Sequence, residues 1–276
     1  MATLKTIDRV NINQLSEPEF NRLYLSGNKP VVITNLFDSI PSLSGWTPEN
    51  LAKKIGNKMI EVYKSKNGIF AADPTGDDES MLPVSMGFMD FIQQMNSPQN
   101  TVKLYMQQLP LHETFPELSE SFKLPDLVLP EKIMEVNLWV GPGGNTSQLH
   151  YDANNNFLMQ LHGSKKITLY HPMDFYNLYP NSCFSLAGHC SKAIDLSDLK
   201  KYPKISKAVA MEATIGPGEL LFIPTYWWHL VHSVDTAVSV NVWWENRLKQ
   251  YFAPAALHNF IFFRYSRYKR WKKKSA

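Results

Sequence analysis

A histidine and an aspartate stand two residues apart in the stretch SQLHYDANNNF, as His150 and Asp152. Residues i and i+2 of a β-strand point to the same face, so an extended QLHYD segment would let both side chains reach one cation. An exposed polar strand edge gives the same pattern and is its more common cause. The pair therefore becomes evidence for a metal site only if a third ligand can be found.

The stretch FIPTYWWHLVHSV offers that third ligand, because it contains His229 and His232. Two imidazoles and one carboxylate form the facial triad of non-haem Fe(II) oxygenases, which leaves adjacent metal positions open for a bidentate oxo-acid and for dioxygen. The two histidines lie three residues apart and face opposite sides of a straight strand. Only one of them can join the metal, and the residues by themselves leave that choice open.

The part of the chain that carries these residues has the pattern of a β-protein. From about residue 102, short runs rich in aromatic and β-branched residues alternate with turns such as GPGGN, HGSKK and GPGE. In the last of these, Pro217 and Gly218 suit the central positions of a type II turn. Short strands separated by such turns indicate a sandwich or barrel, such as a jelly roll.

Helical segments flank the β-rich part. Ser16 and Glu19 have the spacing of a capping box at the start of SEPEFNRLYLSG. Thr47, Pro48 and Gly56 mark the start and the end of a second helix, TPENLAKKIG. The run VSMGFMDFIQQM over 84–95 predicts a third helix, KPVVITNLF predicts a strand, and the chain returns to helix from about residue 246.

Composition excludes several other classes of protein. The chain has 276 residues, of which 44% are hydrophobic, so it can form a sizeable core and is not disordered as a whole. It has no apolar run long enough for a membrane span, and MATLKTIDRV lacks the apolar region of a secretory signal. Cys183 and Cys190 alone form neither a disulfide framework nor a zinc cage, so we expect a reduced, cytoplasmic protein.

The net charge of +3 is a property of the C-terminal tail. Residues 264–276 hold seven of the 28 basic residues and no acid, so the remainder carries 21 basic against 25 acidic residues, or −4. An apolar stripe at helical spacing leads into this tail: Leu257, Phe260, Ile261, Tyr265, Tyr268 and Trp271. A helix packed on the domain is the plainest account. A homodimer interface is the next, and contact with nucleic acid or a membrane surface is the third.

The motifs HYDANNNF, GSKK, GPGELLFIPTYWWH and VNVWW, in this order, resemble the JmjC family of oxygenases. The likeness is to the cupin-like subgroup that includes the asparaginyl hydroxylase of hypoxia-inducible factor and the tRNA wybutosine hydroxylase. It covers roughly residues 30–245 and implies a mainly β fold, a double-stranded β-helix (jelly roll) with N- and C-terminal helices. We expect an oxygenase domain over 1–245 and a C-terminal helix with a basic tail over 246–276.

The resemblance also implies a role for particular residues. It makes His150, Asp152 and His229 the iron ligands, which selects His229 over His232. It implies that 2-oxoglutarate is bound by Lys165, Tyr105, Ser147, Asn156 and Asn241; the family usually has threonine in place of Ser147. A buried dicarboxylate needs a cation at its far end, because an unpaired buried charge is costly. Without the resemblance, the residues alone favour a solvated hairpin position for Lys165, a core position for Tyr105 and a turn position for Asn156.

The activity implied by the resemblance is that of an Fe(II)- and 2-oxoglutarate-dependent dioxygenase. We expect a hydroxylase of a protein or peptide side chain; a tRNA base or a small molecule is the alternative substrate. Hydroxylation is preferred to demethylation because the sequence shows no zinc-binding accessory site. A metal-binding cupin that does not use 2-oxoglutarate is the rival activity, and Lys165 argues against it. The polar insertion over 181–208 is expected to shape the substrate mouth.

Overall fold

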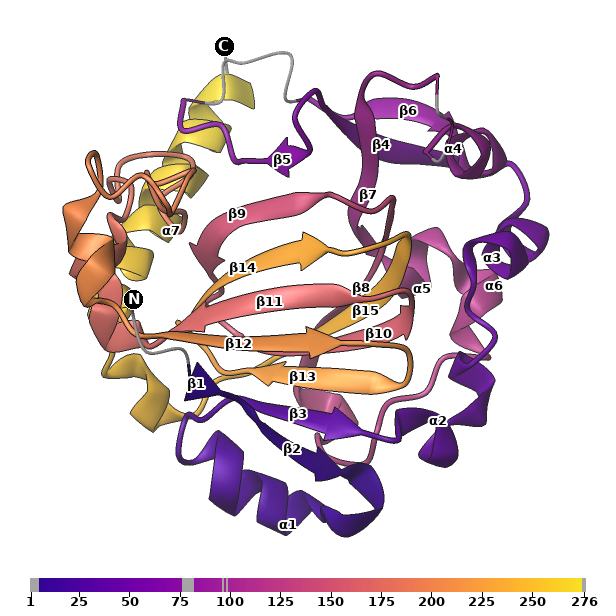
Figure 1. Ribbon diagram of the computed structural model, residues 1–276, viewed down its shortest axis with the longest axis horizontal. Coiled ribbons are helices and arrows are strands. Elements are labelled where there is room, and N and C mark those ends of the chain that lie inside the picture. The colour runs from indigo at the N-terminus through magenta and orange to yellow at the C-terminus, as the bar shows by residue number, and fades with distance from the viewer. Residues whose placement is uncertain (1–4, 76–81, 96, 98, 275–276) are drawn as a thin grey trace.

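Two β-sheets packed face to face form the centre of the molecule in a computed structural model that describes residues 5–75, 82–95, 97 and 99–274 (Figure 1). The six-stranded sheet has the spatial order β1 (Lys5–Thr6), β12 (Ala210–Ile215), β11 (Lys165–Tyr170), β14 (Trp228–Ser233), β9 (Thr146–Tyr151) and β5 (Ile69–Phe70). The nine-stranded sheet has the order β2 (Asp8–Asn11), β3 (Val31–Thr34), β13 (Glu219–Ile223), β10 (Asn155–His162), β15 (Ala237–Trp244), β8 (Ile133–Gly141), β7 (Lys103–Pro110), β4 (Met59–Ser65) and β6 (Val84–Gly87).

Four neighbouring strands from each sheet make up the predicted jelly roll. Strands β12, β11, β14 and β9 pair antiparallel on one side, and β13, β10, β15 and β8 do so on the other. A core cluster lies between the sheets and includes Ile167 and Leu169 of β11 with Leu158 of β10. Phe157 and Met159, the neighbours of Leu158, belong to a second cluster. Successive side chains of a strand alternate between faces, so β10 is buried on both sides.

The second cluster lies on the outer face of the nine-stranded sheet, under the N-terminal helices. These helices are α1 (Glu17–Phe20), which continues as a π-turn (Asn21–Leu25), α2 (Leu36–Ser39), α3 (Pro48–Ile55), α4 (Phe88–Met95), α5 (Leu111–Thr114) and α6 (Pro116–Ser119). The expected capping box of Ser16 and Glu19 is present, and Thr47 caps α3. Gly218 has a φ of +80°, as the predicted turn requires.

The helix predicted over 84–95 is wrong in its first third. Val84–Gly87 forms β6, which pairs antiparallel with the first residues of β4, and α4 begins only at Phe88. The apolar period of this run suits a helix, but its backbone donors and acceptors are taken by the edge of the nine-stranded sheet. Tertiary pairing overrides the local pattern here.

The C-terminal helix α7 (Pro254–Lys274) lies at the end of the jelly roll where β9 ends and β14 begins, beside the insertion over 181–208 (Figure 1). Part of the insertion runs along β9: the backbone N–H of Ser191 donates to Leu149 O at 2.8 Å, and that of Tyr151 to His189 O at 3.1 Å. The insertion thus extends the sheet past β9. Within the described ranges, no helix has both the length and the apolar character needed to cross a membrane.

Candidate active site

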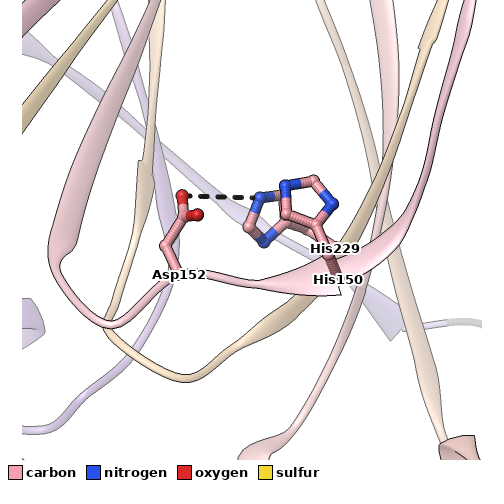
Figure 2. A group of neighbouring side chains, drawn as sticks. All are labelled: His150, Asp152 and His229. Atoms are coloured by element: carbon pink, nitrogen blue, oxygen red, sulfur yellow. Dashed lines mark ion pairs between the residues drawn. The ribbon is translucent and has the colours of Figure 1, made fainter. Parts of the chain in front are cut away.

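The pairing of β9 with β14 brings together the three residues expected to bind iron. His150 lies directly opposite His229 across the two strands, and their ring centroids are 4.1 Å apart. Asp152 follows the last residue of β9. Potential ligand atoms of the three side chains lie within 4.8 Å of one another, and Figure 2 shows the side chains converging from the two strands.

Each histidine presents its Nε2 atom to this cluster. His150 Nδ1 lies 2.6 Å from Gln148 O, and His229 Nδ1 lies 3.0 Å from Trp227 O. A carbonyl oxygen only accepts, so each Nδ1 carries the hydrogen and each Nε2 keeps its lone pair for a metal. Burial lowers the pKa of His229 to about 4, so its ring is neutral. The 3.7 Å contact between His229 Nε2 and Asp152 Oδ2 therefore joins two potential ligand atoms rather than opposite charges.

A chain of hydrogen bonds orients the carboxylate of Asp152. Its Oδ2 accepts from Trp243 Nε1 at 3.1 Å and from Asn156 Nδ2 at 3.3 Å. Asn241 Nδ2 donates to Asn156 Oδ1 at 3.5 Å, and Trp139 Nε1 donates to Asn241 Oδ1 at 2.6 Å. Asn156 and Asn241 thus reach the site through Asp152; their binding of a cosubstrate stays a prediction.

Sequence reasoning missed the two tryptophans of this network. Two neighbouring tryptophans on a strand indicate that one ring faces the interior, but not which of the two rings does so or which side chains it contacts. The deciding fact is the register, which sets Trp243 opposite Asn156. Such a pairing between distant strands leaves no signal in one sequence.

His232 lies outside the metal cluster. It stands opposite Thr146 of β9 and Lys166 of β11, and its Nδ1 is 2.9 Å from Thr146 Oγ1. Lys166 is exposed and forms an ion pair with Glu212 at 2.8 Å, which places this row of side chains on the outer face of the sheet. The geometry agrees with the choice of His229 as the third ligand.

Lys165 occupies the opposite, inner face of β11. Its side chain is only 2% exposed, and its Nζ lies 3.4 Å from the hydroxyl of Tyr105, which is itself buried. Burial lowers the pKa of Lys165 to about 7 and raises that of Tyr105. Among the residues that the structure describes, no carboxylate lies within ion-pair distance of this lysine. The interior thus holds a cation-forming group with no anion of its own.

The strand register relates this lysine to the metal cluster. Lys165 pairs with Ser233, whereas Leu169 of the same strand pairs with His229, so about 13 Å of strand separates the two levels. Ser147 stands opposite Val231, which lies between those levels. Lys165, Ser147 and the metal cluster thus lie at successive levels along the paired strands β11, β14 and β9.

Comparison with known proteins assigns the family. A model of the cupin-like domain matches residues 17–250. The chain is 31% identical over 230 residues to lysine-specific demethylase 8 of Xenopus tropicalis, covering 82% of this chain and 50% of that protein. It is 30% identical over 226 residues to tRNA wybutosine-synthesizing protein 5 of Danio rerio, covering 75% and 66%. The chain belongs to the cupin-like JmjC oxygenases.

A further JmjC relative, Jumonji C domain-containing protein 5 of Drosophila melanogaster, is 29% identical over 262 residues, which cover 89% of this chain and 63% of that protein. The chain thus spans about half to two thirds of the length of such relatives. JmjC oxygenases generally use Fe(II) and 2-oxoglutarate, and the His150, Asp152 and His229 set could bind the metal. Family and ligand set together indicate an enzyme.

Metal binding is expected to depend on the three clustered side chains and not on His232. Replacing His150, Asp152 or His229 by alanine should weaken Mn(II) binding more than roughly 100-fold, since loss of outer-shell partners alone costs 10- to 100-fold. His232→Ala is the matched control and should keep its affinity. Anaerobic titration calorimetry measures both. A metal-free His232→Ala beside a metal-replete His229→Ala would reverse the assignment.

Proposed function

We propose that this JmjC chain is an Fe(II)- and 2-oxoglutarate-dependent hydroxylase that acts on a protein or peptide side chain. The observation that carries the cosubstrate part of the proposal is Lys165, a buried cation-forming group without a carboxylate partner among the described residues. An isolated charge in the protein interior is costly, so such a group suits a site that receives an anion.

Each residue has a defined task in this proposal. Lys165 pairs with the far carboxylate of 2-oxoglutarate, and the hydroxyls of Tyr105 and Ser147 donate to it. His150, Asp152 and His229 would hold the iron as a set of two imidazoles and one carboxylate. The bound metal and cosubstrate supply the activation of dioxygen and the insertion of oxygen into a C–H bond. The chain's own contribution is to orient these groups and to exclude water.

The names of the relatives support more than one substrate. The frog relative is a lysine-specific demethylase, which favours a protein substrate, while the zebrafish relative is a tRNA wybutosine-synthesizing protein. Removal of an N-methyl group and hydroxylation share oxidation of a C–H bond, so this site geometry serves both. Succinate formation from 2-oxoglutarate, screened against protein, peptide and tRNA pools, identifies the substrate class. Mass spectrometry of the product then separates a gain of oxygen from the loss of a methyl group.

Replacing Lys165 by methionine is expected to remove 2-oxoglutarate affinity while keeping the volume of the side chain. Loss of one partner of a buried charge pair costs about 3–5 kcal/mol, which is roughly 100-fold or more in affinity. The matched control is Lys166→Met on the outer face of the same strand. Titration of the Mn(II)-loaded protein under anaerobic conditions measures both. Equal affinities of wild type and Lys165→Met would refute the assignment, and a wild type that binds no 2-oxoglutarate would favour a metal-binding cupin of another activity.

The affinity for 2-oxoglutarate should fall as the pH rises above about 7. The pKa of Lys165 is lowered to about 7 by burial, and a bound carboxylate favours the ammonium form and raises this pKa. Below pH 7 the lysine is already charged. Above it, binding takes up a proton, so affinity should fall by about tenfold per pH unit until the pKa of the bound state is reached. Calorimetry in buffers of different ionisation enthalpy detects this proton, and an affinity independent of pH above 7 contradicts the proposal.

We also propose that the chain forms a homodimer through the exposed side chains Leu257, Phe260 and Tyr268 of the apolar stripe of α7. Leu257, Phe260 and Tyr268 are 69%, 59% and 54% exposed, whereas Ile261 and Tyr265 are half-buried. Exposed apolar side chains along one side of a helix are typical of an interface. Light scattering should give the mass of a dimer for the full chain and of a monomer for Leu257→Glu/Phe260→Glu. A full chain that is monomeric at micromolar concentration removes the dimer.

A further inference from the structure

A continuous row of side chains leads from the metal cluster to helix α7. The ring of His189, in the insertion, lies 6.2 Å from the ring of His150, edge to face. The ring of Phe262, on α7, lies 5.3 Å from that of His189. Phe262 also fills the space beside Gly188, where an added Cβ would lie 2.5 Å from the ring. Helix α7 therefore packs directly on the segment that borders the metal cluster.

His189 brings an unsatisfied polar atom to this place. Its Nδ1 is buried and has no hydrogen-bond partner among the described residues. Buried polar atoms in native structures are nearly always paired, so this atom lacks a partner that a water molecule or a bound group would supply. The backbone of His189 is held by its hydrogen bond to β9, which fixes the ring in place.

A second group of side chains from the insertion and α7 lies on the surface of the molecule. Phe184 of the insertion is 62% exposed, and its ring lies 5.7 Å from that of Tyr265 on α7. Lys269 Nζ lies 5.8 Å from the centre of the Tyr265 ring, and Lys272 follows one turn later on the same side of the helix. Both lysines are exposed, and α7 contains no Asp or Glu over 254–274.

We propose that this surface, formed by Phe184, Tyr265, Lys269 and Lys272, docks a protein segment with acidic side chains next to apolar ones. The acidic groups pair with the two lysines, and the apolar groups pack on the two aromatic rings. The helix that carries this surface packs through Phe262 on His189, which borders the metal cluster. This inference rests on the proposed function and names the chemistry of its substrate.

The same side chains fit a membrane or a nucleic acid less well. A helix that lies on a membrane separates its cations from its apolar face, whereas here Lys269 packs on Tyr265 and Arg264 lies over Phe260. Nucleic acids offer charges and base faces, and their protein interfaces are polar. A protein segment offers both kinds of group that this surface matches: carboxylates for Lys269 and Lys272, and apolar side chains for the rings of Phe184 and Tyr265.

Fluorescence anisotropy with a fluorescein-labelled peptide of repeated Glu-Glu-Phe units tests the docking surface on the full chain. Lys269→Glu/Lys272→Glu should weaken peptide binding by at least about tenfold, because repulsion replaces attraction. Phe184→Ala should weaken it as well. Arg267→Glu/Arg270→Glu is the matched control: it has the same spacing and charge change, but lies on the other side of α7. It should weaken binding by less than about threefold.

Three results would overturn the docking proposal. The first is that both double variants lose the same affinity for the Glu-Glu-Phe peptide. The second is that a Lys-Lys-Phe peptide binds as tightly as the Glu-Glu-Phe peptide. The third is that a single-stranded RNA binds more tightly than the peptide and that Lys269→Glu/Lys272→Glu abolishes the RNA binding. The 2-oxoglutarate titration of the same Mn(II)-loaded variants separates this inference from the proposed function. Unchanged 2-oxoglutarate affinity with lost peptide binding supports the docking surface. A wild type that binds the peptide but no 2-oxoglutarate removes the proposed function and leaves the docking surface standing.

Discussion

The register between β9 and β14 is the constraint on which the rest of the site depends. These strands are separated by most of the jelly roll in sequence, yet one pairing sets His150 opposite His229 and Ser147 opposite Val231. A shift by one residue would turn His229 outward and bring a neighbouring apolar residue inward. The register is held because both sheets contribute apolar residues to the core between them. Packing of side chains remote from the metal cluster thus decides whether the cluster exists.

Burial of Lys165 affects both the stability of the fold and the proposed binding of a carboxylate. Burial lowers the pKa of Lys165 to about 7, so near neutral pH the ligand-free fold bears part of the cost of a buried charge. A carboxylate would offset this cost, because the buried ammonium then has a partner. The hydrogen bond to the Tyr105 hydroxyl holds the amine in place in the meantime. The lowered pKa of Lys165 and the affinity proposed for an anion therefore have one physical origin, the burial of the amine.

Much of the fold and part of the site could be predicted from local patterns. The two-residue spacing places His150 and Asp152 on the same face of an extended segment. The alternation of side chains along β11 places Lys165 and Lys166 on opposite faces. The choice between His229 and His232, in contrast, came from the family resemblance. Their spacing shows only that they lie on opposite faces of the strand, not which of them faces the metal. Trp139 and Trp243 were missed because their contacts depend on register between distant strands. The strand at 84–87 was missed because its partner, β4, overrides its apolar period.

The metal cluster and the surface around it are built from different parts of the chain: the first from strands of the jelly roll, the second from two additions, the insertion over 181–208 and helix α7. Strands β9, β11 and β14 hold the groups expected to bind metal and cosubstrate, and their geometry is fixed by the jelly roll. The insertion and α7 lie outside that framework but pack against it: Ser191 pairs with Leu149 of β9, and the ring of His258 on α7 contacts the hydroxyl of Tyr151. The side chain of His189 borders the metal cluster but takes no part in the pairing of β9 with β14. Under the proposed function, we therefore expect the residues of 181–208 and of α7 to influence substrate choice, and the strands of the barrel to hold the groups for the oxidative chemistry.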